Sequence, residues 1–129
     1  MADNQIKVLI IDDDESIRTL YLERLKAEGF VVEIATNGEN GLAKVTNFKP
    51  DIILLDVMMP KINGFAVLEI LKTTPEYKKI PVIVLSALVR EEDRKRGLEG
   101  GAADFLSKSE SLPTEVVAKI KAVIAKNKK

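Results

Sequence analysis

The sequence predicts an α/β protein with three layers, in which a doubly wound, five-stranded parallel sheet lies between helices. Five short segments rich in Val, Ile or Leu alternate with segments of helical periodicity, and the connections between them are short. Three of the apolar segments are continuous, which is typical of parallel strands covered on both faces. Strand–helix alternation implies right-handed crossovers within one sheet. A single domain spanning residues 1–129 is therefore expected.

The five expected strands are recognised by their length and by their content of Val, Ile and Leu. In chain order they are "VLII" (8–11), "FVVEIA" (30–35), "DIILLD" (51–56), "PVIVLS" (81–86) and "ADFLS" (103–107). The second strand directly follows a glycine turn, and the last is the weakest of the five.

The first expected helix follows the first strand. Apolar residues at positions i, i+3, i+4 and i+8 mark one helical face: Ile17, Leu20, Tyr21 and Leu25. Gly29 suits the position just after the helix, where a left-handed backbone conformation is common. Asp14 and Glu15 stand where an N-cap and a first-turn acid stabilise a helix, so capping is the favoured interpretation for these two acids.

Four further helices are expected. Three of them show apolar stripes, which are Leu42, Val45 and Phe48 before Pro50; Phe65, Leu68 and Leu71; and Val116, Ile120, Val123 and Ile124 after Pro113. The segment 88–100 differs because its centre, "REEDRKR", is entirely charged. Leu88 and Leu98 offer its main apolar contacts, with Val89 as a possible third, so we expect a helix that is held loosely.

The composition excludes several classes of function. The chain has 20 basic and 20 acidic residues, which argues against a basic surface for nucleic acid. It has no Cys and no His, which excludes disulfides, most zinc sites and a Ser-His-Asp arrangement. No signal peptide and no apolar run of about 20 residues are present. We therefore expect a cytoplasmic protein without membrane insertion and without direct nucleic-acid binding.

Polar side chains stand at the carboxyl ends of four expected strands. Asp12 and Asp13 follow the first strand, Asp56 ends the third, Ser86 ends the fourth and Lys108 follows the fifth. In open parallel sheets, ligands bind beyond the carboxyl ends of the strands. We therefore expect these five side chains to converge at one edge of the sheet.

This set of residues suggests a chemistry. Three carboxylates without thiolate or imidazole ligands favour a hard divalent cation, Mg²⁺ or Mn²⁺. A carboxylate beside such a cation can attack phosphorus and form an aspartyl phosphate. A nearby hydroxyl and ammonium would then bind the phosphoryl oxygens.

The sequence resembles the receiver domain of two-component response regulators, the CheY-like family. The resemblance covers essentially the whole chain and rests on four motifs, which are "KVLIIDDDESIR", "PDIILLDVMMPKINGF", "IPVIVLSA" and "GGAADFLSKS". It implies a flavodoxin-like, CheY-like fold with the strand order 2-1-3-4-5.

The resemblance also implies roles for the acids. Asp56 matches the phosphoacceptor of the family. Asp13 matches the direct Mg²⁺ ligand, and Asp12 acts alongside it through a water molecule. The backbone carbonyl of Met58 would complete the protein's share of the metal shell, together with the carboxylate of Asp56.

Further roles concern the switch. Ser86 matches the family's phosphoryl-binding Ser or Thr, Lys108 matches its lysine, and Phe105 stands at the position of its switching aromatic residue. The phosphoryl group would come from a phosphohistidine on a sensor histidine kinase or phosphotransfer protein. Ser86 would then move, the ring of Phe105 would turn inward, and a downstream protein would bind through segment 88–124.

Three positions depart from the family pattern. Ser109 replaces the proline that usually follows the lysine, which leaves two possibilities for the loop: a trans bond, or a cis bond with retained strain. Asn63 stands where an aspartate often precedes the glycine, which affects the turn and the helix cap. Phe105 stands where many members have Tyr and therefore lacks a hydroxyl.

Alternatives remain open at this stage. A Mg²⁺-dependent phosphohydrolase with an aspartyl nucleophile would use the spacing of Asp12 and Asp14, but Ser16 replaces the expected Thr or Val and Asp56 is left unexplained. Nucleotide binding lacks its glycine-rich motifs. A silent pseudo-receiver is disfavoured because all five site positions are filled. A phosphoacceptor switch that catalyses only its own phosphorylation and dephosphorylation is favoured. It is either a free-standing regulator, which is preferred, or a receiver cut from a larger protein.

Overall fold

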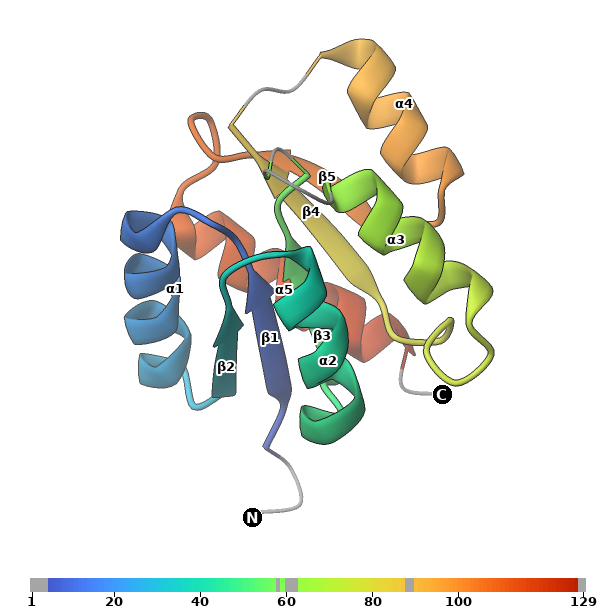
Figure 1. The fold of residues 1–129 in the computed structure, drawn as a ribbon. Helices are drawn as coiled ribbons and strands as arrows, with labels where there is room; N and C mark the ends of the chain where they lie inside the picture. The colour runs from blue at the N-terminus through green and yellow to red at the C-terminus, as the bar shows by residue number, and fades with distance from the viewer. Residues whose placement is uncertain (1–4, 58, 60–62, 88–89, 128–129) are drawn as a thin grey trace.

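The computed structural model describes residues 5–57, 59, 63–87 and 90–127, in which five strands and five helices alternate (Figure 1). The strands are β1 (Lys7–Ile11), β2 (Val31–Ala35), β3 (Ile52–Leu55), β4 (Val82–Ser86) and β5 (Asp104–Ser107). The helices are α1 (Glu15–Ala27), α2 (Gly38–Phe48), α3 (Gly64–Thr73), α4 (Glu91–Glu99) and α5 (Pro113–Asn127). Each predicted strand agrees with the observed one to within a residue at either end.

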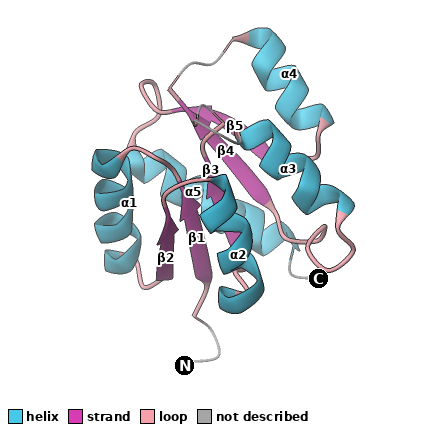
Figure 2. Ribbon diagram, viewed as in Figure 1, coloured by secondary structure: helices cyan, strands magenta, loops and turns pink. Residues whose placement is uncertain are grey.

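The strands form one parallel sheet with the order β2-β1-β3-β4-β5. This confirms the predicted strand order 2-1-3-4-5 and the doubly wound fold. Ile11 pairs with Leu55, and Ser86 pairs with Ser107. The carboxyl ends of neighbouring strands therefore lie in line along one edge of the sheet (Figure 2).

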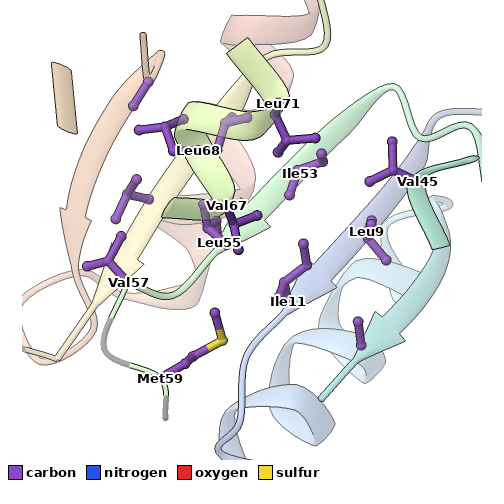
Figure 3. Close-up of a cluster of buried hydrophobic side chains, with 14 of the residues drawn as sticks. Leu9, Ile11, Val45, Ile53, Leu55, Val57, Met59, Val67, Leu68 and Leu71 are labelled. Carbon is purple, nitrogen blue, oxygen red and sulfur yellow. The ribbon is translucent and has the colours of Figure 1, made fainter. Parts of the chain in front are cut away.

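Helices cover both faces of the sheet. On one face, Tyr21 of α1 and Ile120 of α5 pack in a cluster with Leu54 of β3. On the other face lie α2, α3 and α4, and Figure 3 shows Leu71 of α3 directed towards Ile53 of β3 in that cluster. Because both faces are covered, successive residues of the central strands are all buried, which explains their continuous apolar sequences.

The ends of α1 follow the predicted pattern. Asp14 is the N-cap, and its Oδ1 accepts hydrogen bonds from Ser16 N at 2.9 Å and Ile17 N at 3.4 Å. Gly29 follows the helix with a φ of +95°, a left-handed conformation that favours glycine. Of the helices that the structure describes, none has both the length and the apolar character of a membrane span.

Two helices bury different residues from those expected. Leu20 of α1 is 45% exposed and Leu98 of α4 is 43% exposed, whereas the sequence predicted that both contact the core. The residue of α4 that packs inward is Gly97, which lies against the ring of Phe105. The expected contacts of Leu88 and Val89 lie outside the described residues.

Candidate functional site

Main-chain hydrogen bonds of the parallel sheet continue past the strand ends and hold the residues of the site in position. Asp56 N donates to Ile11 O at 2.9 Å, and Asp12 N donates to Ala35 O at 3.1 Å. Lys108 N donates to Ser86 O at 2.8 Å. The residues just beyond β1, β3 and β5 are therefore fixed by the same ladder as the strands themselves.

The ammonium of Lys108 lies between two buried carboxylates. Its Nζ is 2.8 Å from Oδ2 of Asp12 and 3.3 Å from Oδ2 of Asp56. The side chains of Lys108, Asp12 and Asp56 are only 11%, 4% and 3% exposed. Charges this far removed from water are screened weakly, so each of the three groups strongly affects the protonation of the other two.

A third carboxylate completes an acidic cluster. Asp12, Asp13 and Asp56 each provide an oxygen, and these oxygens all lie within 4.8 Å of one another. Asp12 and Asp56 are buried, whereas Asp13 is exposed and faces solvent. The cluster could therefore hold a metal ion that enters from the side of Asp13.

The protonation behaviour of the site reflects its excess of acids. Burial raises the pKa of the Asp12 carboxyl to about 6, and the charge of Asp56 adds to this rise. Hydrogen bonds from Lys108 and from Asp14 N, the latter 2.9 Å long, act in the opposite direction without cancelling it. Burial lowers the pKa of Lys108, but its hydrogen bonds and charge interactions with Asp12 and Asp56 outweigh this, so that pKa is raised. One ammonium does not neutralise the cluster, which favours a cation.

The structure also locates the two expected switch residues. Ser86 ends β4 and is fully buried, and its carbonyl accepts the bond from Lys108 N. Phe105 is fully buried, with its ring stacked on that of Phe65 at a centroid distance of 6.4 Å. The ring therefore lies inward in this structure. The predicted metal ligand Met58 lies outside the described residues.

Sequence reasoning missed several residues around the site. Arg18 of α1 donates from Nη1 to Asp12 O at 3.0 Å, and the guanidinium of Arg96 lies over the ring of Phe65, 4.1 Å from its centroid. Nothing in the sequence pattern marks either arginine. Ser107 is buried beside Lys108, and only its place next to that lysine gave a signal.

The role of Asp14 bears on the phosphohydrolase alternative. That alternative uses Asp12 and Asp14 together, but the carboxylate of Asp14 caps α1 and is not a member of the three-residue acidic cluster. The two acids therefore serve different purposes, which disfavours the phosphohydrolase.

Comparison with known proteins agrees with this geometry. The family model of the response regulator receiver domain matches residues 8–121. The chain belongs to this family. Receiver domains are signalling domains of two-component systems and interact with histidine kinases.

Two related proteins show how this receiver domain compares in sequence. The gliding motility regulatory protein of Myxococcus xanthus is 44% identical over 117 residues, which are 91% of this chain and 15% of that protein. The alkaline phosphatase synthesis transcriptional regulatory protein PhoP of Bacillus subtilis (strain 168) is 41% identical over 122 residues, which are 94% of this chain and 49% of that protein. The chain thus spans less than half the length of both relatives.

Solved structures match the receiver fold over nearly the whole chain. The Francisella response regulator 1452 receiver domain has a TM-score of 0.87 at 31% identity, covering 96% of this chain and all of that chain. Chemotaxis protein CheY4 of Vibrio cholerae has a TM-score of 0.86 at 31% identity, covering 92% of this chain and 98% of that chain.

Proposed function

We propose that the protein is a phosphorylated switch in which Asp56 accepts a phosphoryl group from a phosphohistidine on a sensor histidine kinase or phosphotransfer protein. The observation that carries this proposal is the pairing of Lys108 Nζ with the buried carboxylates of both Asp12 and Asp56. Asp13 stands beside them on the exposed side of the cluster. A nucleophile, a cation and further metal-binding oxygens thus meet at one point that a donor can approach.

The transfer step follows from these positions. An oxygen of Asp56 forms a bond to phosphorus while the phosphorus–nitrogen bond of the phosphohistidine breaks, and the electron pair leaves on the imidazole nitrogen. Lys108 is held within reach of Asp56 and stabilises negative charge on the phosphoryl oxygens. Ser86, at the end of β4, supplies a hydroxyl for the same oxygens. The proposed activity is limited to the domain's own phosphorylation and dephosphorylation.

The acidic cluster fits Mg²⁺, with Mn²⁺ as a substitute. Mg²⁺ binds oxygens at about 2.0–2.1 Å, so opposite ligands lie about 4 Å apart, close to the 4.8 Å limit within which the three oxygens lie. We propose Asp12, Asp13 and Asp56 as the side-chain ligands. The carbonyl of Met58, a fourth proposed ligand, lies outside the described residues. When bound, the ion neutralises negative charge on the cluster and on the phosphoryl group.

The proposed output is a change of the surface formed by segment 88–124. Ser86 and Phe105 are the proposed switch residues, and the ring of Phe105 lies directly beneath Gly97 of α4. A movement of that ring towards Gly97 would therefore displace α4 as well. We propose that a downstream protein reads this change. The proposed setting is the cytoplasm, with one receiver domain over residues 1–129 and no direct contact with nucleic acid or membrane.

The decisive experiment is incubation with Mg²⁺ and acetyl phosphate, followed by intact-mass measurement. We expect one alkali-labile phosphoryl group, which is absent from the Asp56→Asn variant and absent without the metal. Asp51→Asn is the matched control, because Asp51 is an exposed acid at the opposite end of β3. Modification that persists in Asp56→Asn would refute the assignment, as would its loss in Asp51→Asn.

A further inference from the structure

We propose that Ser107 is a positioning residue for Lys108, and that a turn built around its hydroxyl, with Ser109, sets the rate of phosphoryl transfer to Asp56. This inference rests on the proposed function of the site. It concerns the part of the chain that departs from the family pattern, where Ser109 replaces the usual proline.

The side chain of Ser107 is the centre of the turn that follows β5. Its Oγ accepts hydrogen bonds from Ser109 N and Glu110 N, both at 3.2 Å, and lies 3.0 Å from Ser109 Oγ. Ser107 is 7% exposed, so water competes poorly for these contacts. A hydroxyl has one donor and two acceptor positions. Two N–H groups and one neighbouring hydroxyl therefore use its full capacity.

Main-chain bonds hold the same turn from both sides. Ser111 N donates to Ser107 O at 3.0 Å, which closes the turn. Lys108 N donates to Ser86 O at 2.8 Å, which ties the turn to β4. Lys108 thus lies between a fixed strand and a closed turn, and the described peptide bonds, that between Lys108 and Ser109 included, are not cis.

The position of the Lys108 main chain decides where its ammonium can reach. The side chain has four rotatable bonds, so without a fixed base its two contacts, at 2.8 and 3.3 Å, would be averaged over many conformers. Phosphoryl transfer depends steeply on such placement, and an error of about 1 Å can cost about 100-fold in rate. A proline at position 109 would lack the N–H that Ser107 binds. In this loop, hydrogen bonds therefore provide the rigidity that the ring of the usual proline would provide.

The test is a double-mutant cycle on the rate of phosphorylation by acetyl phosphate with Mg²⁺. Ser107→Ala is expected to slow the reaction by about ten- to a hundred-fold, since it removes every contact of the hydroxyl. Ser107→Thr keeps a hydroxyl and is expected to restore most of the rate. In a Lys108→Ala background, Ser107→Ala is expected to have no further effect, because no ammonium remains to be positioned.

Two further variants keep the test informative if Ser107→Ala folds poorly. Ser109→Ala removes one contact of the Ser107 hydroxyl, and we expect a smaller slowing that also disappears in the Lys108→Ala background. Ser111→Ala removes a hydroxyl of the same turn that takes no part in these bonds, and we expect the wild-type rate. Circular dichroism and urea unfolding identify variants that fold.

The outcomes separate this inference from the proposed function. Suppose that the wild type accepts a phosphoryl group and that Lys108→Ala is slow; the proposed function then stands. In that case the positioning role is overturned if Ser107→Ala reacts at the wild-type rate, or if it slows the Lys108→Ala protein further. If the wild type accepts none, the proposed function fails. A crystal structure of Ser107→Ala then decides the positioning role by itself. Lys108 Nζ displaced from Asp12 Oδ2 supports it, and an unchanged 2.8 Å contact overturns it.

Discussion

Gly97 of α4 lies so close to the ring of Phe105 that a Cβ at position 97 would be 2.5 Å from Cδ2 and 2.8 Å from Cε2 of that ring. The missing side chain is what allows α4 to rest on β5. The helix has few other contacts of this kind, since Leu98 is exposed and its remaining described residues are mostly charged.

Gly97→Ala is therefore expected to destabilise the protein. In an unconstrained helix, alanine in place of glycine would stabilise by about 1 kcal/mol. Here the added methyl group must displace α4 or the ring, and such overpacking costs about 1–3 kcal/mol. Urea unfolding measures the difference. Lys95→Ala, an exposed change in the same helix, is the control and should leave stability nearly unchanged. Gly97→Ala more stable than wild type would show that the helix moves freely.

Asp12→Asn is expected to stabilise the metal-free protein at pH 7.5 by up to about 3 kcal/mol, because the folded state raises the pKa of this carboxyl from 3.8 to about 6. A raised carboxyl pKa means that the stability gained by protonating Asp12 is complete below pH 3.8 and is lost as the pH rises through 6. The gain from the substitution should therefore shrink between pH 6 and pH 3.8. Urea unfolding of both proteins across this range provides the measurement, and a difference independent of pH would contradict it.

Mg²⁺ is expected to raise the melting temperature of the wild type, since a ligand at 100 times its dissociation constant stabilises the folded state by about 2.7 kcal/mol. Asp13→Asn should lose most of this response, because it removes one of the three clustered carboxylates. Asp14→Asn is a sharp control, since Asn caps a helix as well as Asp does and Asp14 lies outside the cluster. If both variants lost the Mg²⁺-induced rise in melting temperature equally, the effect would depend on general negative charge and not on the acidic cluster.

Leu20 and Leu25 provide a test of the packing of α1. Leu25 is fully buried, so Leu25→Ala should cost about 2–5 kcal/mol. Leu20 is 45% exposed, so Leu20→Ala should change stability by less than about 0.5 kcal/mol. Both changes delete the same atoms from the same helix, and thermal or urea unfolding compares them directly. Similar losses would show that the face of Leu20 is covered in solution.

The parallel sheet and its acidic edge were predictable because they depend on rules with few exceptions, whereas the strand order 2-1-3-4-5 came from the resemblance to receiver domains. Continuous apolar strands alternating with helices leave few topologies, and parallel strands bring their carboxyl ends together. Asp12, Asp56 and Lys108 could therefore be placed near one another from the sequence. The structure adds the actual pairing, in which Lys108 contacts both acids.

Other features could not be predicted because they depend on how far one element is shifted against another. The contact of Gly97 with Phe105 depends on how closely α4 approaches the sheet, and the periodicity of apolar residues does not determine that distance. Leu20 fits a helical stripe, but α1 buries a narrower line through Tyr21 and Leu25. Ser107 bonds mainly to backbone N–H groups, which every residue but proline carries, so its partners leave no trace in the sequence.

The backbone ladder that carries Asp12, Asp56 and Lys108 past the strand ends has a consequence for how such a domain can change over time. Peptide groups are common to all amino acids, so these main-chain hydrogen bonds can form whichever side chains line the pocket. Under the proposed function, substitutions of those side chains would change the rate or lifetime of phosphorylation while these main-chain hydrogen bonds are kept. The same fold can therefore serve signalling systems with very different rates.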